Sequence, residues 1–233
     1  MAPSRAPDGA RADGPPVERQ VCAVLGHELR NPLAAAVTDI SVAIEMTDRD
    51  DPRAAFLSRA LDDLDRMARI LASCLDWGRG ARPRRREVGA GELAAGLAER
   101  FVDAAAAVDV DLDPAAATAR LLADPALLGR VLDNLVQNAV AVGATSIAVR
   151  FAVADDRLAI TVDDDGPGLP AALGDTVFDP FVSGRGSSGL GLAIVRDVVE
   201  AHDGRVTAVA HGPRGGARFT LDLPLAEAAA WIS

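Results

Sequence analysis

A histidine stands beside a glutamate in the stretch GHELRNPL, residues 26–33, which otherwise follows a helical apolar repeat. The neutral imidazole of His27 can attack an electrophile with one ring nitrogen, after which the other nitrogen must lose its proton. The adjacent carboxylate of Glu28 is well placed to accept that proton. The pair therefore predicts a nucleophile and its general base on a helix, with the ring facing solvent rather than the apolar seam.

Two asparagines, Asn134 and Asn138, lie four residues apart in the stretch LDNLVQNAV. This spacing places both amides on one face of a predicted helix, opposite a buried apolar face. Asparagine is a poor helix former in mid-helix, so the pair calls for an explanation. Two solvent-facing amides are the alternative, but the motifs that follow favour a ligand-binding role.

Two glycine-rich stretches come after these asparagines. In DDDGPGLP, residues 163–170, carboxylates end a strand, and the chain enters a loop through Gly166 and Gly168, where the absent side chains permit close approach of a ligand. In GSSGLGL, residues 186–192, glycines open a helix whose free N–H groups suit phosphate oxygens. Taken alone, the first could be an ordinary acidic turn and the second a packing turn.

Composition limits the class of protein. The chain has 233 residues, 49% of them apolar, and a net charge of −10, so it can bury a core and is not a general nucleic-acid binder. The basic run at residues 79–86 is interpreted as a solvated hinge. The sequence has no long apolar run, so we expect neither a membrane span nor export. A cytoplasmic protein is therefore predicted. Cys22 and Cys74 are expected to be free thiols that lie near each other.

The elements that must position these groups begin with two long helices. Apolar residues step by four and three from residue 17 to about residue 47, and again after a break at residues 48–52 that ends in proline. The short connection predicts an antiparallel hairpin over residues 17–78. Two helices bury too little surface alone, so pairing of two hairpins into a four-helix bundle predicts a homodimer.

After a hinge at residues 79–87, mixed helices and strands predict a helix-on-sheet domain over residues 88–225, which makes the fold class α+β. Residues 1–16 are interpreted as a disordered lead and residues 226–233 as a tail. Within the domain, helices are predicted at residues 91–106, 124–143 and 188–202, strands at 108–112, 145–153, 157–165, 205–211 and 216–224, and a lid at 166–188.

The ordered set HELRNPL, NLVQNA, DDGPG, VFDPF and GLGLAIV resembles the sensor histidine kinases of two-component systems, from about residue 21 to residue 223. The resemblance implies a histidine-phosphotransfer hairpin followed by a Bergerat-type ATP-binding domain, the α/β sandwich shared with gyrase, heat-shock chaperone and mismatch-repair ATPases. His27 would be the phosphoacceptor, and ATP and Mg²⁺ would be the cofactors. The phosphoryl group would pass to an aspartate of a separate response regulator.

By the same resemblance, the later motifs form the nucleotide site. Asn138 matches the Mg²⁺ ligand, Asn134 its companion near the phosphates, and Asp164 the acceptor for the adenine amino group. Asn31, one turn beyond His27, would orient a water molecule that hydrolyses the aspartyl phosphate, which adds a phosphatase activity. The other matches are Gly166 and Gly168 of the first glycine motif, Phe178 and Phe181, which anchor the lid, and Gly189, Leu190 and Gly191 of the second glycine motif.

Some features depart from the family pattern. Ala141 stands where many of these kinases carry a basic residue, a charge that Arg185 in the lid could replace, and Ser187 stands where glycine is frequent. The first twenty residues are too few for an input domain, so either the chain is a shortened form of a longer protein or a separate sensory protein supplies the signal. His202, at a helix C-terminus, is expected to carry a partly protonated ring and no function.

Two alternatives to a kinase stay open. The segment NAVAVGATSI also resembles the mismatch-repair ATPases, which keeps a plain ATPase as a candidate, although such an ATPase has no reason to carry HELRNP on a preceding helix. A non-catalytic dimeric phosphotransfer adaptor is the other candidate. The intact Asn138 and Asp164 argue against the adaptor, because decay of the domain should remove those residues first.

Overall fold

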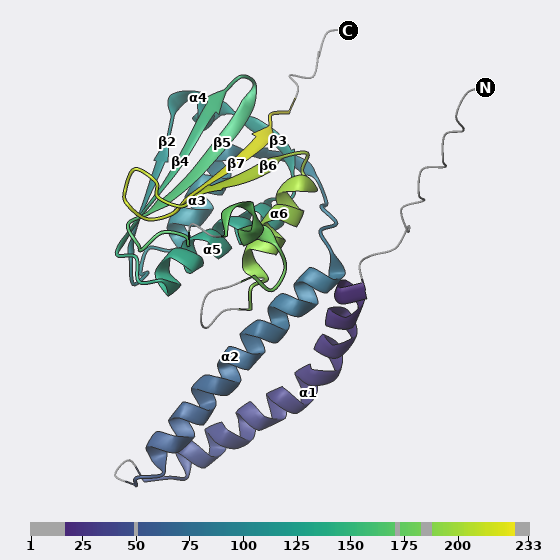
Figure 1. Ribbon diagram of the computed structural model, residues 1–233, viewed down its shortest axis with the longest axis vertical. Coiled ribbons are helices and arrows are strands. Elements are labelled where there is room, and N and C mark those ends of the chain that lie inside the picture. The colour runs from purple at the N-terminus through teal and green to yellow at the C-terminus, as the bar shows by residue number, and fades with distance from the viewer. Residues whose placement is uncertain (1–16, 49–50, 171–172, 183–187, 227–233) are drawn as a thin grey trace, which may run out of the picture. The chain divides into compact units, whose positions relative to one another are not determined.

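A computed structural model describes residues 17–48, 51–170, 173–182 and 188–226 of the chain (Figure 1). The chain divides into two compact units, residues 1–79 and 80–233. The predicted lead at residues 1–16 and nearly all of the predicted tail lie outside the described residues. Among the helices that are described, none combines the length and apolar character needed to cross a membrane.

The first unit is the predicted antiparallel helical hairpin, made of α1 (Val17–Glu45) and α2 (Ala54–Arg79) (Figure 1). The second helix starts after Asp51, whose Oδ1 atom accepts the backbone N–H of Arg53 at 2.8 Å. The apolar seam of α1 is only half buried within one hairpin, and the side chain of Leu29 is 51% exposed. One hairpin therefore leaves much of its apolar surface uncovered.

Close packing of the two helices occurs beside the predicted nucleophile. Gly26 of α1 faces Leu75 of α2, which is fully buried, and a Cβ atom placed on Gly26 would come 2.5 Å from Leu75 Cδ2. One turn earlier, the thiols of Cys22 and Cys74 are free and hydrogen-bonded to each other across the hairpin. The helices approach this closely because residue 26 has no side chain.

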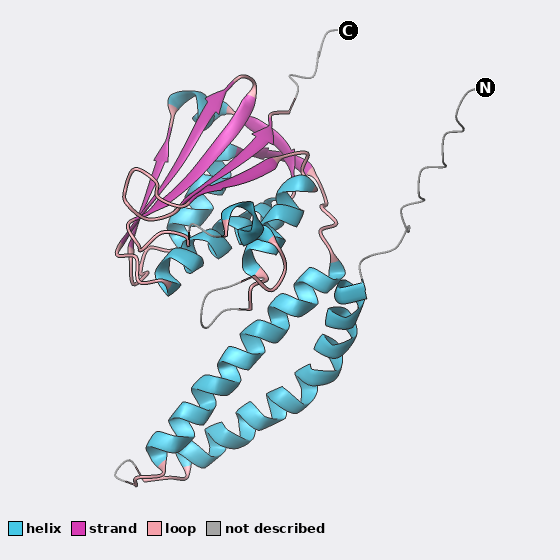
Figure 2. Ribbon diagram, in the orientation of Figure 1, coloured by secondary structure: helices cyan, strands magenta, loops and turns pink. Residues whose placement is uncertain are grey.

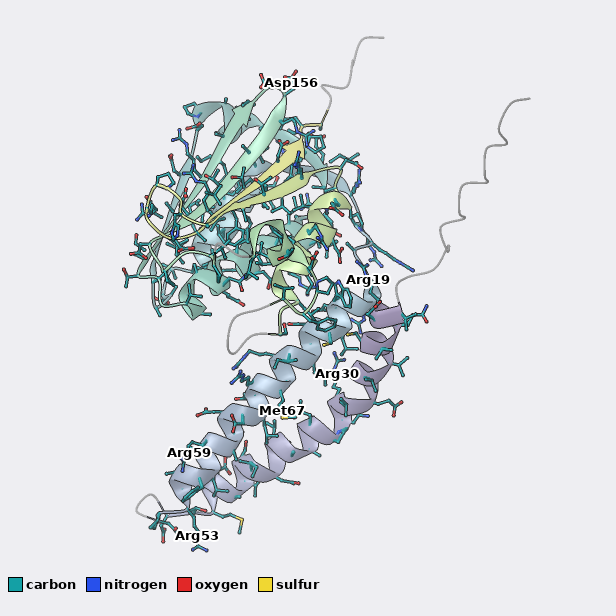
Figure 3. The ribbon with its side chains drawn as sticks, viewed as in Figure 1. Arg19, Arg30, Arg53, Arg59, Met67 and Asp156 are labelled. Atoms are coloured by element: carbon teal, nitrogen blue, oxygen red, sulfur yellow. The ribbon has the colours of Figure 1, made fainter. Side chains whose placement is uncertain are left out.

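The second unit contains a five-stranded sheet in the order β2-β4-β5-β7-β6 (Figure 2). The pair β2–β4 is parallel and the other pairs are antiparallel. Figure 3 places Asp156 at the tip of the β4–β5 turn, where Asp155 and Asp156 both have positive φ, 50° and 57°, as two-residue hairpin turns require. The strands are β2 (Ala107–Leu112), β4 (Ser146–Ala154), β5 (Arg157–Asp164), β6 (Arg205–Val209) and β7 (Arg218–Pro224).

Three helices cover one face of this sheet: α3 (Ala90–Arg100), α5 (Pro125–Ala141) and α6 (Gly191–Glu200) (Figure 2). Their apolar faces meet the inward side chains of the alternating strands, so the core lies between the two layers. Fully buried residues from both layers include Leu97, Leu128, Leu132, Leu135, Phe151, Leu158, Ile160 and Leu221.

The structure corrects several predicted elements of this unit. The helix predicted over residues 91–106 ends at Arg100, because the chain must turn before Ala107 pairs with Ser146 of β4. Alanine propensity is a weak preference that this tertiary pairing overrides. Four short elements were not predicted, since four or five residues show too little periodicity: β1 (Arg86–Gly89), β3 (Arg120–Ala123), α4 (Pro114–Thr118) and the 3₁₀ turn η1 (Gly174–Phe178).

Candidate active site

Helix α5 brings Asn138 to the start of α6. The N-cap is Asp124, as predicted, and its Oδ1 atom accepts the backbone N–H groups of Ala126 and Leu127 at 3.0 and 3.2 Å. Asn134 and Asn138 are half buried, while the opposite face of α5 is fully buried. A Cβ atom placed on Gly191 would lie 3.8 Å from Asn138 Oδ1, so this amide lies against the first turn of α6.

Three consecutive carboxylates at the end of β5 have three different partners. Asp163 forms a two-bond ion pair with the guanidinium group of Arg218, at 2.6 and 2.7 Å. Asp165 accepts the Thr145 hydroxyl at 2.6 Å and the Ser146 N–H at 3.0 Å, which lowers the pKa of Asp165 to about 2. Both side chains therefore have a structural role in the sheet, unlike the carboxylate of Asp164 between them.

The middle carboxylate, Asp164, is 4% exposed and held by backbone N–H groups. Its Oδ1 atom accepts from Gly166 at 2.9 Å and from Ala217 at 3.1 Å. Within the described part of the chain these bonds engage Oδ1, and no bond to Oδ2 is found. The arrangement fixes the carboxylate in one orientation and leaves an acceptor oxygen for a donor on a ligand.

The loop between β6 and β7 supports this carboxylate, and the sequence interpretation missed it. Gly216 donates its N–H to the Asp164 carbonyl at 3.1 Å, and a Cβ atom on Gly216 would fall 2.5 Å from that oxygen and 2.6 Å from Gly166 N. On the same loop, the Ala210 carbonyl accepts the N–H of Leu169 at 3.1 Å. The only signal in the sequence was a pair of glycines in a hairpin loop, which any turn could supply.

The two predicted phenylalanines have different surroundings. Phe178 is 4% exposed and packs edge-on against Phe219, with ring centroids 6.3 Å apart. Phe181 is 53% exposed, has a positive φ of 65°, and donates its N–H to the Gly189 carbonyl at 2.9 Å. A Cβ atom on Gly189 would come 2.5 Å from the Phe181 carbonyl carbon. Phe178 is therefore a core anchor, and the Phe181–Gly189 contact closes the base of the predicted lid.

The second glycine motif forms the first turn of α6. The Ser188 hydroxyl accepts the Leu190 N–H at 3.2 Å, Leu190 is buried, and the helix starts at Gly191. A helix start of this kind offers N–H donors to anions, and here it lies beside Asn138. Arg185 and Ser187 lie outside the described residues, so their expected effects on the lid stay predictions.

In the hairpin, the predicted nucleophile and its neighbours all belong to α1. His27 follows the buried Gly26, and both Glu28 and Asn31 are exposed. The side chain of His27 lies outside the described part of the structure. In the second unit, Asn138 lies beside Gly191 at the start of α6, and Asp164 lies at the end of β5. The fold and this arrangement are those of a nucleotide-binding α/β domain that follows a helical hairpin.

Comparison with known proteins gives the family. Residues 17–82 match the His Kinase A (phospho-acceptor) domain, and residues 123–227 match the histidine kinase-, DNA gyrase B- and HSP90-like ATPase domain. Together the two matches follow the two structural units. The chain belongs to the sensor histidine kinases of two-component systems.

Individual relatives agree with this assignment. The chain is 36% identical over 225 residues to the probable sensor histidine kinase TcrY of Mycobacterium tuberculosis, covering 89% of this chain and 46% of that protein. It is 31% identical over 219 residues to the signal transduction histidine-protein kinase AtoS of Escherichia coli, covering 88% of this chain and 34% of that protein. The crystal structure of full-length ShkA in complex with AMPPNP is similar with a TM-score of 0.73 and 25% identity, covering 92% of this chain and 47% of that one. The chain thus spans less than half the length of these relatives.

Proposed function

We propose that this protein is an autophosphorylating histidine kinase that uses ATP. In the reaction, a ring nitrogen of His27 forms a bond to the γ-phosphorus, the bond from that phosphorus to the bridging oxygen breaks, and ADP leaves. Glu28 accepts the proton that the other ring nitrogen gives up. The observation that carries the proposal is Asp164, a buried carboxylate whose hydrogen bonds from the described residues all engage Oδ1, in a domain where Asn138 lies beside the start of α6 and in a chain that also has the histidine hairpin.

The nucleotide would lie between the ends of β5, α5 and α6. Asp164 Oδ2 would accept the exocyclic amino group of adenine, and the N–H groups near Gly191 would bind the phosphates. The similar ShkA was solved in complex with AMPPNP, which supports an adenine nucleotide as the ligand of this chain. Mg²⁺, when bound, would neutralise phosphate charge, and an amide oxygen such as that of Asn138 suits it because Mg²⁺ prefers oxygen ligands and keeps phosphates and water as the others.

The hairpin would form a homodimer and receive the partners. Exposed apolar residues on both helices support a second copy, which would bury them in a four-helix bundle. They include Val24, Leu25, Leu29 and Val42 of α1 and Met67 of α2, which Figure 3 labels midway along its helix. An aspartate of a separate response regulator would take the phosphoryl group from His27, and Asn31 would orient water for its later hydrolysis. The use of ATP supports a cytoplasmic place for the reaction, and a separate sensory protein could supply the signal.

Incubation with Mg²⁺ and γ-labelled ATP tests the proposal, with His27→Gln as the control. The kinase gives label that survives base and is lost in acid, as a phosphoramidate does, and that is absent from the control. ATP hydrolysis without such label would favour the plain ATPase. If the protein neither binds nucleotide nor becomes labelled, the result would favour the phosphotransfer adaptor.

Two further variants test individual residues. Asn31→Ala should keep autophosphorylation but lose hydrolysis of the phosphorylated regulator, and intact hydrolysis would contradict the role of that amide. Arg185→Ala should weaken ATP binding if this residue supplies the charge that Ala141 lacks. Unchanged ATP affinity would remove Arg185 from the site.

A further inference from the structure

The chain segment just before β1 is attached to both helices that flank the nucleotide site. Residues 79–86 were interpreted as a solvated hinge, but the described contacts fix its second half on the second unit. Arg84 donates its backbone N–H to Asp124 Oδ2 at 2.9 Å. Arg85 binds the C-terminal end of α6, with one guanidinium nitrogen 2.6 Å from Asp203 Oδ2 and another 2.5 Å from the Ala201 carbonyl oxygen.

One carboxylate, Asp124, joins this segment to α5. Its Oδ1 atom caps the helix, and its Oδ2 atom holds Arg84. Burial raises the pKa of Asp124, but the N–H groups of Arg84, Leu127 and Ala126 outweigh burial, so the pKa lies below its ordinary value. An ionised carboxylate at this position thus has both oxygens occupied, and a shift of Arg84 would be felt at the first turn of α5.

His202 connects the same carboxylate residue to α6. The side chain is 2% exposed, and its Nε2 atom accepts the backbone N–H of Asp124 at 2.9 Å. Because Nε2 accepts, Nδ1 carries the proton and donates to the Val198 carbonyl at 2.7 Å. The ring therefore bridges the ends of α5 and α6.

We propose that Arg84, Arg85, Asp124 and His202 form a linker clamp. The clamp fixes the linker, residues 79–86, to α5 and α6, the helices that carry Asn138 and Gly191. The proposal rests on the proposed kinase activity, and it makes Arg85 a positioning residue for phosphoryl transfer. The exposed Arg85–Asp203 pair contributes little to folding stability, so what the contact controls is the path of the chain. Helix α2 ends at Arg79 and the clamp begins at Arg84. When the clamp is formed, residues 80–83 are therefore the part of the linker that it does not hold.

Fixing the linker favours reaction between units that are joined by it. A shorter free connection raises the effective concentration of one tethered group near another, and phosphoryl transfer requires close alignment of nucleophile and phosphate. None of the four clamp residues is among the predicted nucleotide ligands. Loss of the clamp should therefore slow transfer to His27 at saturating ATP and leave the nucleotide affinity unchanged.

The full-length variants Arg85→Ala and Arg85→Lys separate this role from a structural one. Arg86→Ala is the matched control, because Arg86 is the adjacent exposed arginine and its guanidinium contacts Glu87 and Glu92 instead of α6. We expect Arg85→Ala to lower the autophosphorylation rate at saturating ATP at least about threefold, with the Kd for AMPPNP within twofold of wild type. Arg85→Lys keeps the charge opposite Asp203 and should recover part of the rate.

Asp124→Asn provides a second route to the same measurement. Asparagine remains a good N-cap for α5, but its NH₂ group cannot accept the N–H of Arg84. It should therefore slow transfer as Arg85→Ala does, without removing charge from the linker. The clamp would be overturned if Arg85→Ala autophosphorylates at the same rate as Arg86→Ala, or if it loses AMPPNP affinity in parallel with its rate. In either case, labelling of the wild-type protein would still support the kinase activity. Absence of label in the wild type would overturn both.

Discussion

Gly216 offers a sharp test of how the candidate nucleotide site is held. In Gly216→Ala the new methyl group would overlap Asp164 Oδ1 and come 2.5 Å from the Asp164 carbonyl oxygen and 2.6 Å from Gly166 N. All three atoms belong to the structure that fixes the carboxylate, and none is the far end of a flexible side chain. Asp164 must therefore move, and the oxygen proposed for the adenine amino group moves with it.

The expected loss follows from that displaced hydrogen bond. A hydrogen bond to a charged group is worth about 1.5–3 kcal/mol, which corresponds to a loss of about ten- to hundredfold in nucleotide affinity. The loss should be specific to the amino group. Wild type should prefer ATP to inosine triphosphate, which lacks it, and Gly216→Ala should bring the ratio of the two affinities towards one.

Fluorescence titration with both nucleotides measures these affinities. Gly215→Ala is the control. Its φ of 95° disfavours alanine, but nothing lies within 4 Å of the added Cβ. We expect it to cost stability and to leave nucleotide preference intact. ATP binding by Gly216→Ala within twofold of wild type, or an unchanged preference for ATP, would refute this account of the site.

Three further predictions concern other parts of the molecule. Gly26→Ala should lower hairpin stability by about 0–2 kcal/mol, from overpacking of about 1–3 kcal/mol less about 1 kcal/mol of helix propensity. The free energy of unfolding is measured by urea titration followed by circular dichroism. In a Leu75→Ala background, Gly26→Ala should no longer cost stability, and strictly additive effects of the two substitutions would contradict the contact. Thr145→Val should raise the pKa of Asp165 from about 2 towards 3.8, as read from the carboxyl carbon resonance. Because a depressed pKa keeps the ionised form to lower pH, the stability that Asp165 contributes should then disappear at higher pH than in wild type, and an unmoved pKa would exclude the hydroxyl as its cause. Burial and the neighbouring thiol raise the pKa of Cys74 from 9.0 to about 11, so alkylation at pH 8 should be about a hundredfold slower than for an exposed cysteine, and rapid labelling would contradict that environment.

Long periodic segments and contiguous motifs could be predicted from the sequence. The two hairpin helices have repeats long enough to distinguish a helix from a strand, and α5 has a recognisable cap in Asp124. Asp164, Asn138 and Gly191 each stand in a contiguous motif, so each could be named before the fold was known. That Asn138 would lie beside Gly191 followed from resemblance to a family, because no local pattern encodes such a contact.

The remaining features depend on contacts between residues far apart in the chain. Gly216 supports the site because it lies against Asp164, whereas the residues next to it in sequence indicate only an ordinary turn. Arg85 was grouped with a run of exposed arginines, although it binds α6 more than a hundred residues later, at Ala201. The same reason applies to His202, whose Nε2 atom accepts the N–H of Asp124, a residue 78 positions earlier in the chain. Such pairings are decided by tertiary structure, which local propensity cannot report.

The single parallel pair of the large sheet has a consequence for the order of folding. Strands β4 and β5 are joined by a tight turn and can pair at once, whereas β2 reaches β4 only after α4, β3 and α5 have been traversed. Chain entropy favours early formation of such local contacts, so we expect β2 to join late. Pulse-labelled hydrogen exchange should then protect the amides of β4 and β5 before those of β2. Helix α5 lies in this crossover, so the asparagines would reach their final places among the last parts of the molecule to fold.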